Sequence, residues 1–227
     1  MKKYKKIIAI LLMLIIIFSC IGLKISGNNN VSSFSNLLSL SEQDNSEDWY
    51  LILVNSDNPV PKHYDTELTK LSNGTCVDKR IYPSLQKMFD DARKQGVNPI
   101  VREGFRTGDD QEEIMQNRID KYISEGYSKM QAKRKAREEV AKPGTSEHEL
   151  GLAVDINAGD GSSAEEVYSW LAKNAYKYGY ILRYPAEKES ITGIEYEPWH
   201  YRYVGKEAAE KIYNEHITLE EYLKELL

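Results

Sequence analysis

Two short segments of the 227-residue chain bring imidazole and carboxylate groups together, the side chains that bind metal ions and transfer protons. The first contains His148 and ends at Asp155, whose expected neighbours on its strand face are only Gly151 and Ala153. Such small neighbours leave space beside the carboxylate for a cation. The second segment ends at His200. Two imidazoles and one carboxylate are a ligand set of catalytic zinc, in which the fourth position is left for water.

Glu197 precedes the second of these histidines and is placed to act as a general base. Its carboxylate lies three residues before His200, a spacing that we expect to bring it within reach of a water molecule that a metal has made acidic. Each feature taken alone also has an ordinary explanation, because a histidine beside acids is commonly a surface residue. Asp155 likewise fits a turn after an apolar strand. We expect His63 and His216 to be ordinary residues, since neither has a companion carboxylate and glycine pattern.

The elements expected around these residues indicate an α+β domain, with a small antiparallel sheet flanked by helices. Short β-prone or alternating runs predict strands at residues 50–54, 98–102, 150–157, 180–184 and 200–204. Helical spacing and cap residues predict helices at residues 83–94, 109–140 with a break near Gly126, 164–178, and twice more before the C-terminus. Alternation puts Leu152, Val154 and Ile156 on one strand face and Asp155 on the other.

Composition narrows the class of protein. Apolar residues make up 41% and charged residues 29% of the chain, as in globular proteins. The net charge of −5, from 30 basic and 35 acidic residues, argues against a nucleic-acid binder. Cys20 and Cys76 are too few for a disulfide framework, and no Cys-x-x-Cys pair is present for a thiolate zinc site. The basic stretch 129–137 is interleaved with other residues and predicts a solvated helix face.

The chain divides into three predicted regions. Residues 1–23 combine four early lysines with an apolar run, which predicts a signal or membrane anchor with everything after it outside the cytoplasm. We favour an uncleaved anchor over a cleaved signal or a lipoprotein attached at Cys20. Residues 24–48 are rich in Ser and Asn and predict a flexible linker. Residues 49–227 then form the folded domain.

Two motifs in this order, Ser-x-His-x-x-Gly-x-Ala-x-Asp at 146–155 and Glu-x-Trp-His at 197–200, resemble those of the zinc D-alanyl-D-alanine peptidases. This family includes the VanY-type carboxypeptidases of vancomycin resistance. Other segments that look like it are Ile52–Asn55 with Asn58 and Tyr64, 79–96, Gly104–Thr107 with Gln111, Arg183–Pro185 and Arg202–Gly205. The resemblance covers nearly all of 49–205. It implies the hedgehog/D,D-peptidase-like zinc fold, with one Zn²⁺ per chain.

The resemblance also implies a role for each matching site residue. The implied zinc ligands are His148, Asp155 and His200, the base is Glu197, the oxyanion-stabilising cation is Arg106, the substrate contacts are Ser146, Gln111 and Tyr184, and Trp199 shapes the site. The chain departs from the family pattern at 103–105, where Glu-Gly-Phe replaces the more frequent Ser-Gly-Tyr. This departure removes a hydroxyl near the substrate and concerns specificity rather than catalysis.

If Glu197 is the base and His200 a ligand, the backbone between them is expected to be irregular. Pro198 biases Glu197 toward an extended conformation, whereas a regular strand turns His200 to the opposite face. For both side chains to reach one metal, the backbone around Pro198 and Trp199 must depart from a regular strand.

The function implied by the resemblance is removal of the terminal D-alanine from peptidoglycan stem peptides by a zinc D,D-carboxypeptidase. The expected partners are these peptides or their precursors and the membrane, not nucleic acid. An alternative is an L,D-carboxypeptidase that uses the same site on the tetrapeptide stem. An endopeptidase is less favoured, because no wall-binding module is visible. A silent binding domain is disfavoured, because Glu197 and Arg106 are both present.

Overall fold

The computed structural model describes residues 48–227, and its central feature is a four-stranded antiparallel sheet in the order β3-β4-β6-β5. The strands of this sheet are β3 (Pro99–Glu103), β4 (Ala153–Ala158), β5 (Tyr180–Leu182) and β6 (His200–Tyr203). A separate two-stranded hairpin joins β1 (Leu68–Lys70) to β2 (Cys76–Asp78). The predicted α+β class with a small antiparallel sheet is confirmed. The regions predicted at 1–23 and, apart from its last residue, at 24–48 lie outside the described residues.

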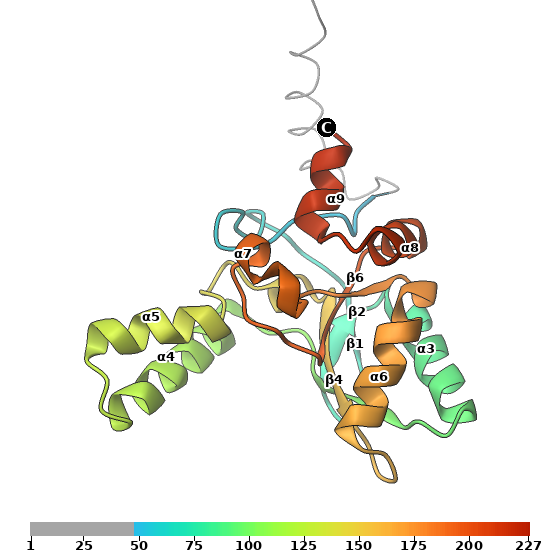
Figure 1. Cartoon of the computed structure of the whole chain (residues 1–227), viewed down its shortest axis with the longest axis horizontal. Coiled ribbons are helices and arrows are strands. Elements are labelled where there is room, and N and C mark those ends of the chain that lie inside the picture. Colours follow the sequence, from blue (N-terminus) through green and yellow to red (C-terminus); the bar gives the residue numbers. More distant parts are fainter. Residues whose placement is uncertain (1–47) are drawn as a thin grey trace, which may run out of the picture. The chain divides into compact units, whose positions relative to one another are not determined.

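Helices surround the sheet on several sides. The α-helices are α3 (Tyr82–Lys94), α4 (Gly108–Ser124), α5 (Lys129–Glu139), α6 (Ala164–Asn174), α7 (Glu189–Thr192), α8 (Lys206–Glu215) and α9 (Leu219–Glu225). Single 3₁₀ turns are η1 (Glu147–Leu150), η2 (Ala175–Tyr178) and η3 (Ala186–Lys188). Figure 1 shows α3 and α6 together beside the sheet, while α4 and α5 project away from it on the other side. Capping boxes fix where α4, α5, α6 and α9 begin, as their polar N-cap residues dictate.

Most of the predicted elements are present, with one clear error. The break expected near Gly126 is confirmed, because α4 ends just before this glycine and its φ of 95° suits no other residue well. The strand predicted at 50–54 is wrong. Arg202 Nη2 donates hydrogen bonds of 2.9 Å to the carbonyls of Tyr50 and Ile52, so a side chain takes acceptors that a strand ladder would use. The short β1–β2 hairpin was not expected from the sequence.

The two faces of the sheet have different roles. Val154 and Ile156 of β4 are fully buried, together with Leu152, and pack in a core with α3 and α6, as the alternation predicted. Tyr201 of β6 is paired with Val154 and points into the same core. Asp155 therefore lies on the opposite face of the sheet. Each buried aliphatic side chain contributes about 1.5–3 kcal/mol, so the core face fixes the register of the strands.

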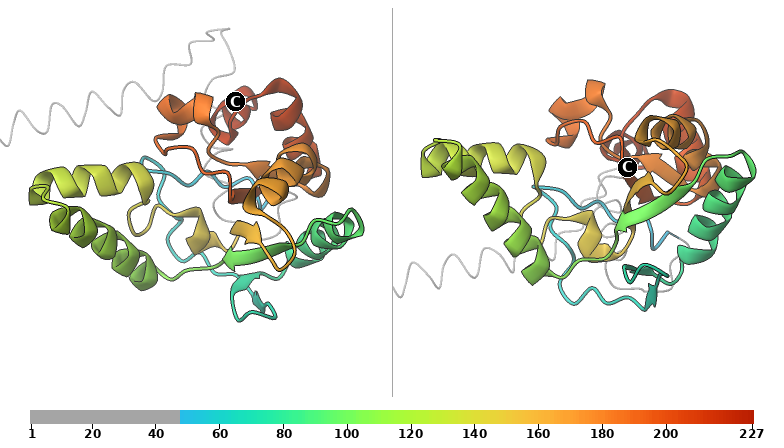
Figure 2. Two further views of the ribbon diagram at one scale, coloured as in Figure 1. Left: turned by 60° about the horizontal axis from the view of Figure 1, so that its bottom comes forward. Right: turned by 90° about the horizontal axis from the view of Figure 1, so that it is seen from below.

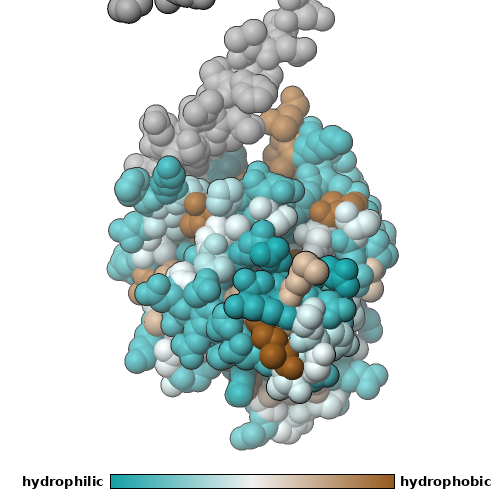
Figure 3. All heavy atoms as spheres, turned by 90° about the vertical axis from the view of Figure 1, so that its left-hand side faces the viewer, coloured by the Kyte–Doolittle hydropathy of each residue, from teal (hydrophilic) through white to brown (hydrophobic). Residues whose placement is uncertain are grey.

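The α4–α5 hairpin has a small core of its own and a polar surface. Its buried residues include Met115 and Ile119 of α4 and Ala132 and Ala136 of α5. Both views in Figure 2 show this hairpin extending from the rest of the described domain. The face of the molecule that it presents is mainly hydrophilic, with small separate hydrophobic areas (Figure 3). Within residues 48–227, no helix is long and apolar enough to cross a membrane.

The fold predicts that Ile156→Ala lowers the free energy of unfolding by about 2–5 kcal/mol, because it opens a cavity in the core behind β4. Ile100→Ala is the matched control, since Ile100 lies on the neighbouring strand and is 37% exposed. Urea unfolding of the full chain measures both variants. Equal losses of stability would contradict the assignment of the core to this face of the sheet.

Candidate active site

The pairing of β4 with β6 brings two of the predicted metal ligands together. Asp155 and His200 are direct partners in the register of these strands, and Asp155 Oδ1 lies 3.0 Å from His200 Nδ1. His148 comes from η1, and its Nε2 lies 3.4 Å from Asp155 Oδ1. One ligand atom from each residue lies within 4.8 Å of the other two. The structure thus gathers the three predicted ligands at one point on the sheet face opposite the core.

Local structure fixes the direction of the His148 ring. Ser146 caps η1, and Gly151 ends it with a φ of 71°. His148 Nδ1 lies 2.7 Å from the carbonyl oxygen of Gly104, so this nitrogen donates and the Nε2 lone pair faces Asp155. Glycine is required at position 104, because a Cβ atom there would lie 2.2 Å from the backbone oxygen of Cys76. The close packing at position 104 thereby holds the Gly104 carbonyl beside the His148 ring.

The three residues fit a divalent cation. His148 Nε2 and Asp155 Oδ1 are buried, and no hydrogen bond of acceptable geometry reaches either atom. Burying such groups unpaired costs about 1–3 kcal/mol each, a cost that a shared cation removes. Burial disfavours a charged imidazole, yet the carboxylates of Asp155 and Glu147 outweigh it and raise the pKa of His200 to about 9. The same negative potential attracts a metal ion, and two imidazoles with one carboxylate suit zinc with an open position.

Glu197 lies beside the ligands but outside the cluster. The backbone N–H of His200 donates to the Glu197 carbonyl over 3.2 Å, which closes a turn at Pro198 and Trp199. The irregularity predicted there is confirmed. The turn brings Glu197 Oε2 to 3.5 Å from His200 Nδ1, with the side chain 16% exposed. Burial raises the pKa of the Glu197 carboxyl to about 7, so this group can exchange a proton near neutral pH.

Arg106 is held at the edge of the cluster by its neighbours. Its Nη2 lies 4.0 Å from Asp155 Oδ2, and its backbone N–H donates to the carbonyl of His148. Its Nη1 donates to Gln111 Oε1 over 2.9 Å, and Gln111 Nε2 donates to the carbonyl of Ala141 over 2.7 Å. Gln111 is only 1% exposed and both ends of its amide bond to this chain. The substrate contact predicted for Gln111 stays a prediction.

The remaining predicted residues lie around the cluster in different ways. The Tyr184 ring lies 4.8 Å from the His200 ring and forms part of the wall of a crevice of about 170 Å³. Ser146 is 5% exposed and lies two residues before His148. Trp199 is half-buried, and its carbonyl accepts a hydrogen bond from Ile156, which ties the turn to β4. The substrate roles of these residues stay predictions.

Sequence reasoning missed a set of buried charges behind the site. Glu147 is fully buried, with Oε1 2.8 Å from Arg183 Nε and 3.0 Å from Arg202 Nη1. Arg183 also pairs with Glu220 of α9 at 2.6 Å. Burial opposes ionisation of Glu147, but the two arginines outweigh it and lower the pKa of this carboxyl. The available signal was the presence of Arg183 and Arg202 in two segments that resemble the family, although neither arginine was assigned a role there.

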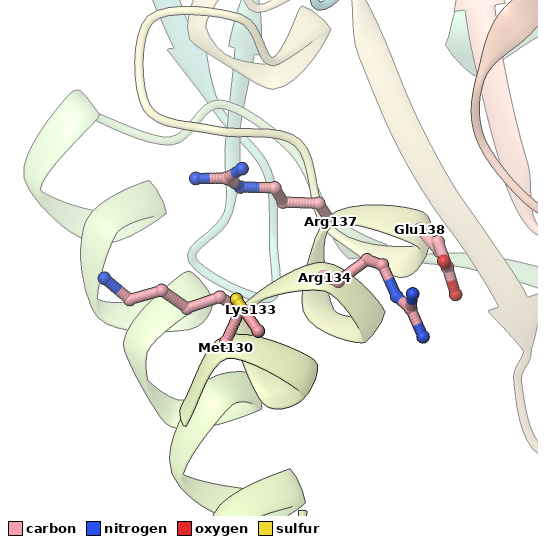
Figure 4. A pocket seen from close by; sticks show the side chains of 5 residues that line it. All are labelled: Met130, Lys133, Arg134, Arg137 and Glu138. Atoms are coloured by element: carbon pink, nitrogen blue, oxygen red, sulfur yellow. The ribbon is translucent and has the colours of Figure 1, made fainter. Parts of the chain in front are cut away.

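A second hollow, on α5, contains none of the predicted site residues. Its lining residues are Met130, Lys133, Arg134, Arg137 and Glu138. In Figure 4 the side chains of Lys133 and Arg137 point to one side and those of Arg134 and Glu138 to the other. They do not converge on a common point. This arrangement agrees with the solvated helix face predicted for the basic stretch.

Comparison with protein families and curated sequences identifies similar proteins. The family model for VanY, D-alanyl-D-alanine carboxypeptidase, matches residues 74–206. A D-alanyl-D-alanine carboxypeptidase of Enterococcus faecalis (strain ATCC 700802 / V583) is 55% identical over 188 residues, which are 82% of this chain and 70% of that protein. The putative carboxypeptidase YodJ of Bacillus subtilis (strain 168) is 38% identical over 193 residues, which are 78% of this chain and 67% of that protein.

The chain is also similar to solved structures of carboxypeptidases. A variant of the vancomycin resistance D,D-pentapeptidase VanY from the VanB-type cassette, in complex with Zn(II), superposes with a TM-score of 0.76 at 57% identity, covering 77% of this chain and 99% of that chain. VanYB in complex with D-alanine-D-alanine gives the same TM-score and identity, over 78% of this chain and 98% of that one. The LdcB LD-carboxypeptidase gives a TM-score of 0.63 at 38% identity, over 76% and 84%.

The geometry predicts about one zinc ion per purified full chain, measured by elemental analysis. His200→Ala removes one ligand and is expected to lose the bound metal. His216→Asn is the matched control, because His216 is exposed, lies in a left-handed conformation that asparagine tolerates, and is not a member of the ligand cluster. Equal zinc content in the two variants would contradict the ligand assignment.

Proposed function

The chain belongs to the D-alanyl-D-alanine carboxypeptidase family, and from this premise we propose that it removes the terminal D-alanine from peptidoglycan stem peptides in a zinc-dependent reaction. The observation that carries the proposal is the convergence of His148, Asp155 and His200, with the carboxylate of Glu197 and the guanidinium of Arg106 beside them. The complexes of similar proteins with Zn(II) and with D-alanine-D-alanine support it.

Glu197 is the proton carrier in this proposal. Zinc held by His148, Asp155 and His200 would supply Lewis-acid chemistry, which lowers the pKa of a bound water molecule to about 7. Glu197 takes the proton of the attacking water and later returns one to the leaving amine of D-alanine. The Glu197 side chain is 16% exposed, and burial raises its pKa to about 7. Both properties suit a group that must accept and release a proton at neutral pH.

Arg106 stabilises the negative charge that develops on the oxygen of the scissile carbonyl. Such a donor is typically worth about a hundredfold to a thousandfold in rate. The arginine must be held in place to act in this way, and Gln111 accepts from it while being anchored to the carbonyl of Ala141. We therefore propose that Gln111 acts on the substrate through Arg106. Ser146 and neighbouring backbone amides supply donors for the free carboxylate of the substrate.

A second candidate is an L,D-carboxypeptidase acting on the tetrapeptide stem. The observation in its favour is the likeness to the LdcB LD-carboxypeptidase. Likeness to the vancomycin resistance D,D-pentapeptidase is greater in both identity and superposition, which favours D,D-cleavage. The two reactions share the metal, the base and the oxyanion donor, so only the substrate distinguishes them.

The direct test is incubation of the full chain with synthetic pentapeptide and tetrapeptide stems, followed by mass spectrometry. We expect the pentapeptide to lose one D-alanine and the tetrapeptide to stay intact. Glu197→Gln keeps the shape of the side chain but removes the proton acceptor. It should reduce the rate by about two to four orders of magnitude while the zinc content stays unchanged.

Glu195→Gln is the control for this variant, because Glu195 lies in the same segment with an exposed side chain. It should keep the wild-type rate. Cleavage of the tetrapeptide but not of the pentapeptide would contradict D,D-cleavage and support the L,D-carboxypeptidase. Near-wild-type turnover by Glu197→Gln, or loss of its zinc, would show that this residue is not the base.

We also propose that residues 1–23 anchor the enzyme in the membrane, with residues 49–227 on the outer side, where peptidoglycan lies. The support is the lysine-rich start followed by the apolar run. External protease should therefore digest the domain on cells stripped of their wall and leave a short membrane-bound stub. A domain protected until the cells are lysed would contradict this orientation, and release of an intact domain into the medium would indicate a cleaved signal instead.

A further inference from the structure

Glu147 is a buried carboxylate that faces the side of His200 turned away from the other ligands. Its side chain has no exposed surface, and Oε2 lies 3.7 Å from His200 Nε2. Both atoms are buried and neither has a hydrogen-bond partner. The opposite nitrogen of the same ring, Nδ1, lies 3.0 Å from Asp155 Oδ1. One edge of the imidazole thus faces the ligand cluster, and the other edge faces Glu147.

The two unpartnered atoms complement each other. An imidazole that offers its Nδ1 lone pair to a metal carries its proton on Nε2. Among the described residues, the carboxylate oxygen within 4.0 Å of that nitrogen is Glu147 Oε2. The separation of 3.7 Å is longer than a hydrogen bond, so pairing requires the two groups to move closer together. Both groups would otherwise stay buried at a cost, so pairing is favoured.

We infer that Glu147 is a positioning residue, which holds His200 in its metal-binding orientation by accepting a hydrogen bond from Nε2–H. This inference rests on the zinc site of the proposed function. Metal-ligating histidines generally donate their second nitrogen to a carboxylate or a carbonyl oxygen, and His148 does so to Gly104. Glu147 supplies the same support to the second histidine, so the two rings are fixed through opposite nitrogens.

Two arginines hold this carboxylate in place. Arg183 Nε and Arg202 Nη1 both approach Glu147 Oε1, at 2.8 and 3.0 Å. This division leaves Oε2 for His200. Arg183 is fixed in turn by two hydrogen bonds to Glu220, of 2.9 and 2.6 Å. Glu147 is thus held by two arginines, and Glu220 of the C-terminal helix α9 adds to the pairing of one of them without contacting His200.

The test is the zinc affinity of Glu147→Gln in the full chain, by competition with a chromophoric chelator. The single oxygen of the new amide is drawn to the two arginines, which leaves its NH₂ group facing His200 Nε2 and removes the acceptor. We expect zinc to bind about 10- to 100-fold more weakly. Wild-type affinity in this variant would overturn the inference.

Glu220→Gln is the matched control. This substitution weakens the ion pair of Arg183, which also pairs with Glu147, but residue 220 has no contact with His200. Both variants should unfold at lower urea concentration when zinc has been removed, because both leave buried positive charge less well compensated. Only Glu147→Gln should also lose zinc affinity. A purely structural role for Glu147 predicts that both variants lose stability and that neither loses zinc affinity.

A measurement on the unaltered protein keeps the inference testable if Glu147→Gln does not fold. In zinc-loaded full chain labelled with ¹⁵N-histidine, NMR should find the proton of His200 on Nε2, exchanging slowly with water, and that of His148 on Nδ1. A proton on Nδ1 of His200 would overturn the inference. Failure of the wild-type chain to bind zinc at all would instead contradict the proposed function.

Discussion

The antiparallel pairing of β4 with β6 is the constraint on which the site depends. It makes Asp155 and His200 direct partners, so two predicted ligands that are far apart in the chain meet on neighbouring strands. Because side chains alternate along a strand, the pairing that puts these two residues on one face puts Val154 and Tyr201 in the core on the other. A shift of the register by one residue would destroy the core and the site together.

A second feature of the site is the balance of buried charge. Two acidic side chains, of Glu147 and Asp155, lie within 4.0 Å of three guanidinium groups, of Arg106, Arg183 and Arg202. Buried ions of this kind contribute little net stability, since desolvation offsets most of their attraction. Their value here is orientation. Fixed charges hold the ligands at the place where a cation and a developing oxyanion must both be stabilised.

The features of the fold and the site that could be predicted from the sequence are those that depend on nearby residues. Alternation through Leu152, Val154 and Ile156 identified the core face of β4, and the Pro198 constraint identified the turn that lets Glu197 approach His200. The parts that could not be predicted depend on distant partners. Residues 50–54 have the composition of a strand, yet the side chain of Arg202 takes their carbonyls.

Glu147 shows the same limit within the motif itself. Its neighbours in sequence made it one acid among several, and only the folded chain shows that it lies between two arginines and His200. The positions of Gln111 and Tyr184 show the same limit. Their positions follow from contacts across the domain, with Ala141 and His200, which no local pattern contains.

The central claim is that strands β4 and β6 and turn η1 share a single metal ion. A crystal of the zinc-loaded chain, measured at the zinc absorption edge, tests it most directly through the anomalous difference map. The account predicts one strong peak at bonding distance, about 2 Å, from His148 Nε2, Asp155 Oδ1 and His200 Nδ1. A peak elsewhere, or one in contact with only one of these elements, would contradict it.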